Sequence, residues 1–308
     1  MIEGSGFNNT LEGTSSCPNA AKARSISFDA MDSWIDTYLA DATDRLKKQA
    51  GNYNWTVDDT YHAQEMCPYE TVALGYSRFC SLFTPDEWVG FEYSIAIQVM
   101  ANTGFLSPVG RAVGVGYVVE FLSRMEGHVV NDTAAPSQVN MTLDANPVAF
   151  PVNQSLYFDF THETTLAAIL TAFGLTQFAQ DMPTTGPPQD LQFISSEVIP
   201  FATRLVIEII TAPRPVLSKR PQTSGESAYD MSQGEKETKY VHFVLNQRTV
   251  PLGRSFAECG DRDDGWCELE TFLDLQRKGV EHADFEYACF GDYDMPKYGD
   301  VTDGVPPR

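Results

Sequence analysis

Residues 155–175 read S-L-Y-F-D-F-T-H-E-T-T-L-A-A-I-L-T-A-F-G-L, and their hydrophobic period changes half-way along. The first part, Leu156 to Phe160, is short and aromatic-rich, which is typical of a buried β-strand. From Leu166 onward the apolar side chains recur at helical spacing as far as Gly174, a residue that often ends helices. The stretch therefore predicts a strand followed directly by a helix.

The junction between these two parts carries Thr161, His162 and Glu163. The first turn of a helix offers unpaired backbone N–H groups and the positive end of the helix dipole, so anions bind well there. A histidine and a carboxylic acid at such a point indicate a phosphate or carboxylate site with an acid beside it. The alternative is structural, because a glutamate in a first turn often serves only the dipole and most single histidines have no catalytic role.

The pair His162–Glu163 also opens the zinc motif H-E-x-x-H. The second histidine of that motif would stand at position 166, which is Leu166. The sequence therefore predicts no metal site and no cofactor.

The composition narrows the class of protein. The 308 residues are 43% hydrophobic and 12% aromatic, which is ample for a packed core, and they carry a formal net charge of −21. That charge argues against nucleic acid and anionic membranes as partners, because both attract basic surfaces. It suits an extracellular protein in an acid medium, although solubility alone explains it equally well. No run of about 18 apolar residues occurs, so no membrane span is predicted.

Glycosylation signals and cysteines indicate the compartment. Five Asn-x-Ser/Thr sequons, the acceptor signal for N-linked glycans, begin at Asn8, Asn54, Asn131, Asn140 and Asn153. The six cysteines allow 15 disulfide pairings, among which the sequence alone does not choose. Together these features predict a secreted, extracellular glycoprotein. The first residues have neither the basic nor the apolar part of a signal peptide, so we expect the natural N-terminus to lie upstream.

Patterning along the chain divides it into four segments. The helical stretches begin with one long amphipathic pattern from Phe28 to Leu46. The clearest helix start is Thr84-Pro85-Asp86-Glu87, which combines a capping residue, a proline at the first helical position and a capping-box glutamate. The predicted segments are a polar opening loop (1–25), an all-helical domain (26–128), a β-rich and mixed part with the His-Glu motif (129–295) and a flexible tail (296–308).

Two further sequence features are interpreted as structural rather than functional. The G-x-G at Gly114 to Gly116 is too short for a dinucleotide-binding loop, and we interpret it as a site of close helix packing. Between the β-rich runs, residues 213–239 are rich in Pro, Ser, Lys and Glu, which predicts a mobile insert. The basic cluster from Arg214 to Arg220 in this insert is interpreted as a solvated loop.

Several motifs resemble those of one family, in the same order along the chain. They are I-E-G at Ile2–Gly4, F-C-S-L-F-T-P-D-E-W at Phe79–Trp88, G-V-G-Y at Gly114–Tyr117, Y-F-D-F-T-H-E-T-T-L-A-A-I-L-T-A-F-G-L at Tyr157–Leu175, P-F-A-T-R-L at Pro200–Leu205 and V-P-L at Val250–Leu252. On these motifs the chain resembles the histidine acid phosphatases, especially the secreted fungal phytases. The resemblance implies an α/β sandwich domain, here incomplete, with an inserted all-α domain and an active site between the two. Residues 1–25 and 129–295 would belong to the α/β domain.

The resemblance also implies roles for particular residues. His162 would contact the transferring phosphoryl group, and Glu163 would protonate the leaving alcohol. The substrates would be phosphomonoesters, with phytate as one candidate. The implied disulfides are Cys17–Cys289, Cys67–Cys80 and Cys259–Cys267, which leave no cysteine over.

Two positions depart from the family pattern. Glu163 stands where the family usually has aspartate, and one extra methylene moves the proton by about 1 Å, a displacement that is costly in catalysis unless the leaving group lies correspondingly further out. A lysine pair of the phytase pocket would fall near Gln98 and Val99, which carry no positive charge. A generic phosphomonoester is therefore a more secure substrate than phytate.

The nucleophile of the family is absent. Family catalysis uses a histidine in the segment R-H-G-x-R-x-P, which forms a phosphohistidine intermediate. The chain has His62, His128, His162, His242 and His282, none of which follows an arginine or precedes a glycine. In the family this segment lies before the point where the present sequence begins.

We therefore expect the chain by itself to be inactive. Its expected partners are a small-molecule phosphomonoester and the missing N-terminal portion of the same enzyme. Three interpretations remain open: a truncated enzyme, an enzyme cleaved into two chains, or a non-catalytic phosphate-binding or surface glycoprotein with the same fold.

Overall fold

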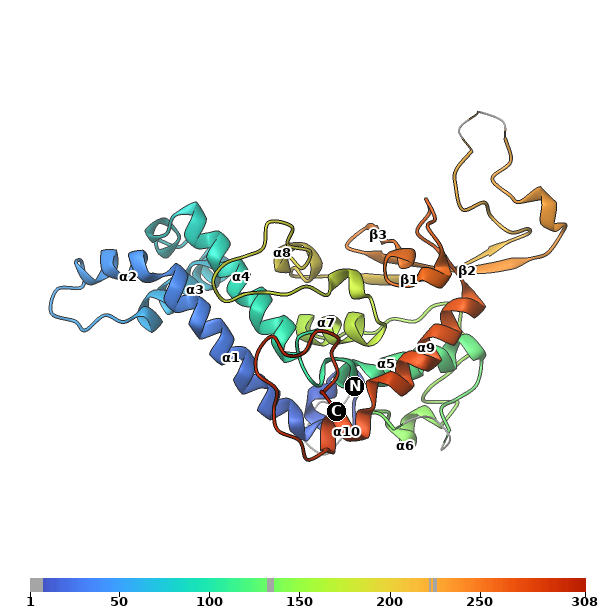
Figure 1. Ribbon diagram of the computed structural model, residues 1–308, viewed down its shortest axis with the longest axis horizontal. Coiled ribbons are helices and arrows are strands. Elements are labelled where there is room, and N and C mark those ends of the chain that lie inside the picture. Colours follow the sequence, from blue (N-terminus) through green and yellow to red (C-terminus); the bar gives the residue numbers. More distant parts are fainter. Residues whose placement is uncertain (1–7, 132–135, 222, 224–225) are drawn as a thin grey trace.

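The computed structural model describes residues 8–131, 136–221, 223 and 226–308 (Figure 1). The motif match at Ile2–Gly4 lies outside the described residues. The helices are α1 (Pro18–Tyr38), α2 (Ala40–Lys47), α3 (Val57–Leu74), α4 (Pro85–Asn102), α5 (Gly110–Glu126), α6 (Met141–Asp144), α7 (Glu163–Ala172), α8 (Ser195–Val198), α9 (Leu269–Ala283) and α10 (Phe285–Phe290). The strands are β1 (Leu205–Ala212), β2 (Thr238–Leu245), β3 (Arg248–Val250) and β4 (Cys267–Glu268). A long helical region is thus followed by a mixed α/β region, as the sequence predicts.

Helices in the first half begin at their capping signals. The Thr84 hydroxyl accepts from the Glu87 backbone N–H at 3.3 Å, while the Glu87 carboxylate accepts from the Thr84 N–H at 2.8 Å, so both halves of the predicted capping box form. Thr56 and Asp59 form the same box at the start of α3. These side chains satisfy backbone groups that a helix leaves unpaired at its start, so local sequence is enough to set the boundary.

Helices α1 and α4 pack closely where a glycine removes the side chain between them. A Cβ on Gly90 would lie 2.3 Å from the Tyr38 ring, and the Trp34 indole N–H donates to the Gly90 carbonyl at 2.8 Å. The single long helix predicted here breaks at Leu39, whose φ of −97° and ψ of 3° leave the helical region while its side chain stays buried. Because α1 begins before residue 25, the predicted boundary of the helical domain falls inside it.

Helices α5 and α7 lie against each other at Gly114. A Cβ there would lie 2.2 Å from the Ala168 carbonyl oxygen, so the interpretation of this glycine as a close-packing residue is confirmed. Phe173, directly after α7, joins these helices to the sheet. Its ring centroid lies 5.4 Å from that of Phe121 on α5 and 5.1 Å from that of Phe243 on β2. The end of the helix that carries the His-Glu motif is therefore packed in the hydrophobic core.

The sheet is small and antiparallel. Its strand order is β1-β2-β3, and β4 also pairs with β2. In the register of the first pair, Leu205 faces Leu245 and Ala212 faces Thr238. Among the described residues β2 is the one neighbour of β1, so the other edge of β1 is open.

The strand predicted from Leu156 to Phe160 does not form. These residues have no regular secondary structure, and the side chains of Leu156, Phe158 and Phe160 are 64%, 75% and 81% exposed. A strand is stable only when a neighbour completes its hydrogen-bond ladder and other elements cover its apolar face. No described strand pairs with this segment, so Phe158 and Phe160 face solvent, while Tyr157 is half-buried.

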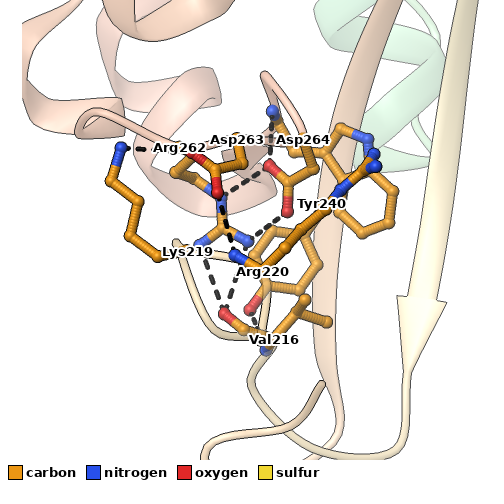
Figure 2. A network of polar contacts seen from close by, with 8 residues as sticks. Val216, Lys219, Arg220, Tyr240, Arg262, Asp263 and Asp264 are labelled. Carbon is orange, nitrogen blue, oxygen red and sulfur yellow. Dashed lines mark hydrogen bonds and ion pairs between the residues drawn. The ribbon is translucent and has the colours of Figure 1, made fainter. Parts of the chain in front are cut away.

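The insert between β1 and β2 is anchored at its base (Figure 2). The Lys219 ammonium pairs with Asp263 at 3.2 Å, and the Arg220 backbone N–H donates to the same carboxylate at 2.9 Å. Arg262 in turn donates to the Val216 carbonyl at 3.3 Å. The basic cluster predicted as a solvated loop is therefore partly bound to the acidic turn that the Cys259–Cys267 disulfide closes.

The last residues, predicted as a flexible tail from 296, contact two loops of the molecule instead. The Tyr298 hydroxyl donates to the Met182 carbonyl at 2.6 Å, and the Gly304 N–H donates to the Phe105 carbonyl at 2.8 Å. Val301 is buried. These contacts are made by backbone groups and by single side chains such as Tyr298 and Val301. They leave no regular spacing of apolar residues, so the sequence pattern does not reveal them.

All six cysteines pair as the resemblance implied: Cys17–Cys289, Cys67–Cys80 and Cys259–Cys267. The first bond joins the residue that precedes α1 to α10 across 272 positions of sequence. The other two close short loops. In the part of the chain that the structure describes, no helix is both long and apolar enough to cross a bilayer.

Candidate functional site

The His-Glu motif lies at the exposed first turn of α7. His162 is the N-cap residue, with φ −88° and ψ 160°, and Glu163 is the first helical residue. Both side chains are exposed, whereas the following turns of α7 are buried. The helical half of the predicted junction is confirmed, and the helix begins at the acid itself.

Two hydrogen bonds hold this helix end in place. The Thr161 hydroxyl donates to the Leu11 carbonyl at 2.6 Å, and the Thr103 hydroxyl donates to the Thr164 carbonyl at 3.0 Å. The motif is therefore fixed from both sides by segments distant in sequence. Its helix terminus presents backbone N–H groups and the positive dipole end toward solvent, an arrangement suited to an oxyanion.

A buried arginine holds the segment that leads into the motif. The Arg124 guanidinium pairs with the Asp159 carboxylate at 2.6 and 3.2 Å. It also lies over the Tyr157 ring, 4.8 Å from its centroid, and over the Phe150 ring at 5.3 Å. Ion pairing and cation–π contact together fix residues 157–159 without a β-ladder.

Burial by itself lowers the pKa of Arg124, but its hydrogen bonds to Asp159 together with the negative charges of Asp159 and Glu120 raise the pKa, so the cation persists. Its charge is directed mainly at Asp159, because the distance to the Glu120 carboxylate is longer, at 3.4 Å. Glu120 is buried and accepts from the Thr10 hydroxyl at 2.5 Å. Burial, followed by the charge of Asp144, raises the pKa of Glu120 to about 7.

Sequence reasoning missed this cluster, although a signal was present. Tyr117, Glu120 and Arg124 follow one another at spacings of three and four residues, which places them on one face of α5. A polar face on an otherwise buried helix predicts partners elsewhere. The partner itself, Asp159, lies 35 residues from Arg124 and carries no local signal of that contact.

The other four histidines lie in separate parts of the fold, each beside a carboxylate. The pairs are His62–Glu65 at 2.8 Å, His128–Glu126 at 3.0 Å, His242–Glu208 at 2.8 Å and His282–Asp303 at 2.7 Å. They come from α3, the end of α5, β2 and α9. None of these contacts joins them to the His-Glu motif.

The pocket positions on α4 offer no positive charge. Gln98 is half-buried and Val99 is fully buried, so Val99 faces the core. Arg111, another buried arginine, donates to the Asp303 carbonyl at 2.7 Å and pairs with its carboxylate. The cations described so far are thus committed to structural carboxylates, whereas a phosphate site needs several converging donors.

The sequons differ in their surroundings. Asn8, Asn54, Asn131 and Asn153 are exposed. Asn140 is half-buried, caps α6 by accepting from the Thr142 N–H at 3.1 Å, and donates to the Asn8 carbonyl at 3.4 Å. Glycosylation at all five remains a prediction.

The fold and the site define a class: a mixed α/β protein with a helical domain and a His-acid pair at a helix N-terminus. The family model of the histidine phosphatase superfamily (branch 2) matches residues 2–246. The chain therefore belongs to that superfamily, as a histidine acid phosphatase of the phytase-like kind.

Relatives and a solved structure agree with this assignment. The chain is 32% identical over 299 residues to Phytase A of Aspergillus terreus, which covers 94% of this chain and 57% of the relative. It is 27% identical to an acid phosphatase of Schizosaccharomyces pombe, covering 86% and 49%. The crystal structure of the phytase from D. castellii superposes with a TM-score of 0.60 at 18% identity, covering 97% of this chain and 53% of that one. The chain spans about half the length of the proteins that it matches.

Proposed function

We propose that this chain is the motif-bearing part of a secreted histidine acid phosphatase that hydrolyses phosphomonoesters, phytate being one candidate. The main observation in support is the His-Glu pair at the exposed N-terminus of α7, in a chain that belongs to this superfamily. Three disulfides and five sequons support a secretory route.

The proposed chemistry divides between the two motif residues. A histidine nucleophile attacks phosphorus and the P–O bond to the alcohol breaks, while Glu163 gives its proton to the departing oxygen. His162 and the N–H groups of the helix terminus stabilise the charge on the phosphoryl oxygens. Water then cleaves the phosphohistidine and returns the enzyme to its starting state.

The nucleophile is proposed to come from a segment outside these 308 residues. Support comes from the histidine count, since the other four histidines are paired in distant elements, and from the coverage of about half of each relative. The exposed run Leu156 to Phe160 and the open edge of β1 are the surfaces on which we place that segment. Pairing there would complete the ladder and cover the aromatic side chains.

The first experiment compares the 308-residue chain with a form extended upstream to include R-H-G-x-R-x-P. We expect no turnover of p-nitrophenyl phosphate by the short chain and robust turnover by the long form. Activity of the short chain would contradict the proposal that the nucleophile lies elsewhere.

The second experiment uses the extended form to test the two roles. Proton donation is worth about 10² to 10⁴ in rate. Glu163→Gln should therefore strongly lower the rate of hydrolysis of glycerol phosphate. It should lower the rate for p-nitrophenyl phosphate much less, because the leaving group of that substrate is already a stable anion. His162→Ala should slow both substrates alike, and Glu163→Asp is the matched control that keeps the acid. Equal losses on both substrates in Glu163→Gln would exclude the proton-donor role.

The alternative is a non-catalytic phosphate-binding or surface glycoprotein. The observation that favours it is the absence of R-H-G-x-R-x-P from the 308 residues. If the extended form binds inorganic phosphate but turns over neither substrate, this alternative holds.

A further inference from the structure

An open surface pocket lies between α3, the loop that precedes it and Phe79. Figure 1 shows α2 and α3 at one end of the molecule, away from α7. The pocket has a volume of about 450 Å³, and its walls are mainly aromatic with acidic side chains among them. The lining residues are Tyr53, Trp55, Asp59, His62, Ala63, Glu65, Met66, Tyr69 and Phe79. The phosphatase chemistry proposed above uses none of these residues.

The capping box of α3 and the Cys67–Cys80 disulfide hold the walls of this aromatic pocket in place. The Tyr53 hydroxyl donates to Asp59 at 3.2 Å, and Asp59 is itself locked into the capping box of α3. On the other side, Met66 and Phe79 each adjoin a cysteine of the Cys67–Cys80 bond. The pocket is therefore preorganised, so a ligand does not bear the cost of ordering these walls.

The rings form a corner rather than a flat patch. The Tyr53 and Trp55 centroids lie 6.0 Å apart with the ring planes at 69°. Tyr69, which is 70% exposed, contributes a further aromatic side chain to the lining. Aromatic faces carry negative potential, so a corner of this kind attracts cations.

Three of the polar groups around the pocket already have partners within the protein. The Tyr53 hydroxyl bonds to Asp59, and the Trp55 indole N–H donates to Thr60 at 2.8 Å. His62 Nδ1 pairs with Glu65 at 2.8 Å. A sugar or a phosphate would seek such donors, and the carboxylates would repel a phosphate. Hydrogen bonds from the backbone and side chain of Thr56 lower the pKa of Asp59, so this carboxylate stays charged.

From these observations we infer that the aromatic pocket binds an organic cation, specifically a methylated ammonium group of the choline or trimethyl-lysine type. Such a group needs aromatic faces and nearby negative charge but no hydrogen-bond donors, which is the combination that the pocket offers. The net charge of −21 adds a long-range attraction for cations. The site is separate from the phosphate site and does not depend on the proposed phosphatase activity.

The test titrates the 308-residue chain with choline and follows binding by NMR or calorimetry. The control ligand is 3,3-dimethylbutan-1-ol, which has the same shape without the charge. We expect choline to bind in the millimolar range and the neutral alcohol at least about fivefold more weakly, from the usual strength of cation–π contacts. Equal binding of the two ligands, or no binding of choline in that range, overturns the proposal.

Matched variants locate the site. Tyr69→Ala should weaken choline binding by about threefold to tenfold, the range expected for one aromatic face. Tyr76→Ala removes a tyrosine of similar exposure, 67%, that does not line the pocket, and should leave the affinity unchanged. Because both side chains are exposed, neither variant should unfold the chain. An unchanged affinity in Tyr69→Ala, or equal losses in the two variants, would place choline elsewhere and refute the assignment.

Discussion

The helical region and the α/β region of this chain differ in how their elements are held together. In the helical region, capping boxes, glycine contacts and a disulfide close each element onto its neighbours. In the α/β region, β1 has an open edge and large aromatic side chains face solvent, among them Phe158, Phe160 and Phe201. Exposed apolar side chains also occur on the helices, for example Val72 and Leu74, so among the described residues the contrast lies in the unpaired edge of β1.

The difference follows from where each kind of element finds its hydrogen bonds. A helix satisfies most backbone groups within itself and needs help only at its ends. A strand finds all its ladder partners on other strands, which lie far away in sequence. The described helices can therefore be stable with few distant contacts, whereas each described strand depends on the strand beside it. The predictions below test this contrast, from the largest expected effect to the smallest.

The largest effect should come from the bond that joins the two regions. Replacing Cys17 and Cys289 by serine opens a loop of 272 residues and should lower the free energy of unfolding by about 5.6 kcal/mol, from the loop-entropy relation. The matched control is the Cys67 and Cys80 double replacement, whose 13-residue loop should cost about 3 kcal/mol. Urea unfolding of both variants measures the difference. Equal losses would show that the long bond does not join otherwise separate regions.

The next effect concerns the buried Glu120. Its pKa of about 7 in the folded protein, against 4.5 for an exposed glutamate, means that folding favours the protonated form. Its stabilisation is full below pH 4.5 and is lost as the pH rises through about 7. Glu120→Gln should thus stabilise the protein by up to about 3 kcal/mol above pH 7 and by little near pH 4.5.

Urea unfolding at both pH values measures this effect. Glu286→Gln is the control, because Glu286 is exposed on α10 and its charge should not matter. If Glu120→Gln gave the same difference at both pH values, then Glu120 would not be the titrating group.

A glycine pair tests the packing where the helical region meets the α/β region, at the contact between α5 and α7. Gly114→Ala places a methyl group 2.2 Å from the Ala168 carbonyl oxygen and should cost about 1 to 3 kcal/mol through overpacking. Gly279→Ala on α9 is the control, since its nearest neighbour atom lies 3.8 Å away and alanine favours helix. Thermal unfolding should show a loss in the first variant and no loss in the second. An unchanged unfolding temperature in Gly114→Ala would contradict this prediction and show that α5 and α7 can move apart at little cost.

The smallest effect on the free energy of unfolding is expected in the α/β region, at a side chain that faces solvent. Phe158→Ser should change the unfolding free energy by less than about 0.5 kcal/mol, because the side chain is 75% exposed. It should also reduce binding of a hydrophobic dye and self-association at high concentration. Phe173→Ser is the contrasting control and should be severe, since that ring is buried in the core. A large loss from Phe158→Ser would mean that the exposed segment is packed in solution.

The sequence by itself determined the elements whose signals are local. The Thr84 capping box, the glycine packing at Gly114 and the start of α7 at the His-Glu motif are all visible in short stretches of sequence. The family resemblance added the three disulfide pairs, which spacing alone left open among 15 arrangements. The cap and the helix start depend on neighbours a few residues apart, and the disulfide pairs on a pattern shared with the family, whereas Gly114 shows close packing in the sequence without showing its partner Ala168.

Only the tertiary structure decided the rest. It left Leu156 to Phe160 without a ladder, docked the C-terminal residues onto Phe105 and Met182, and placed Arg124 against Asp159. The contacts among them join residues that lie tens to hundreds of positions apart in the sequence. Periodicity records which face of an element is apolar, but the element that covers that face is decided by the folded arrangement of the whole chain.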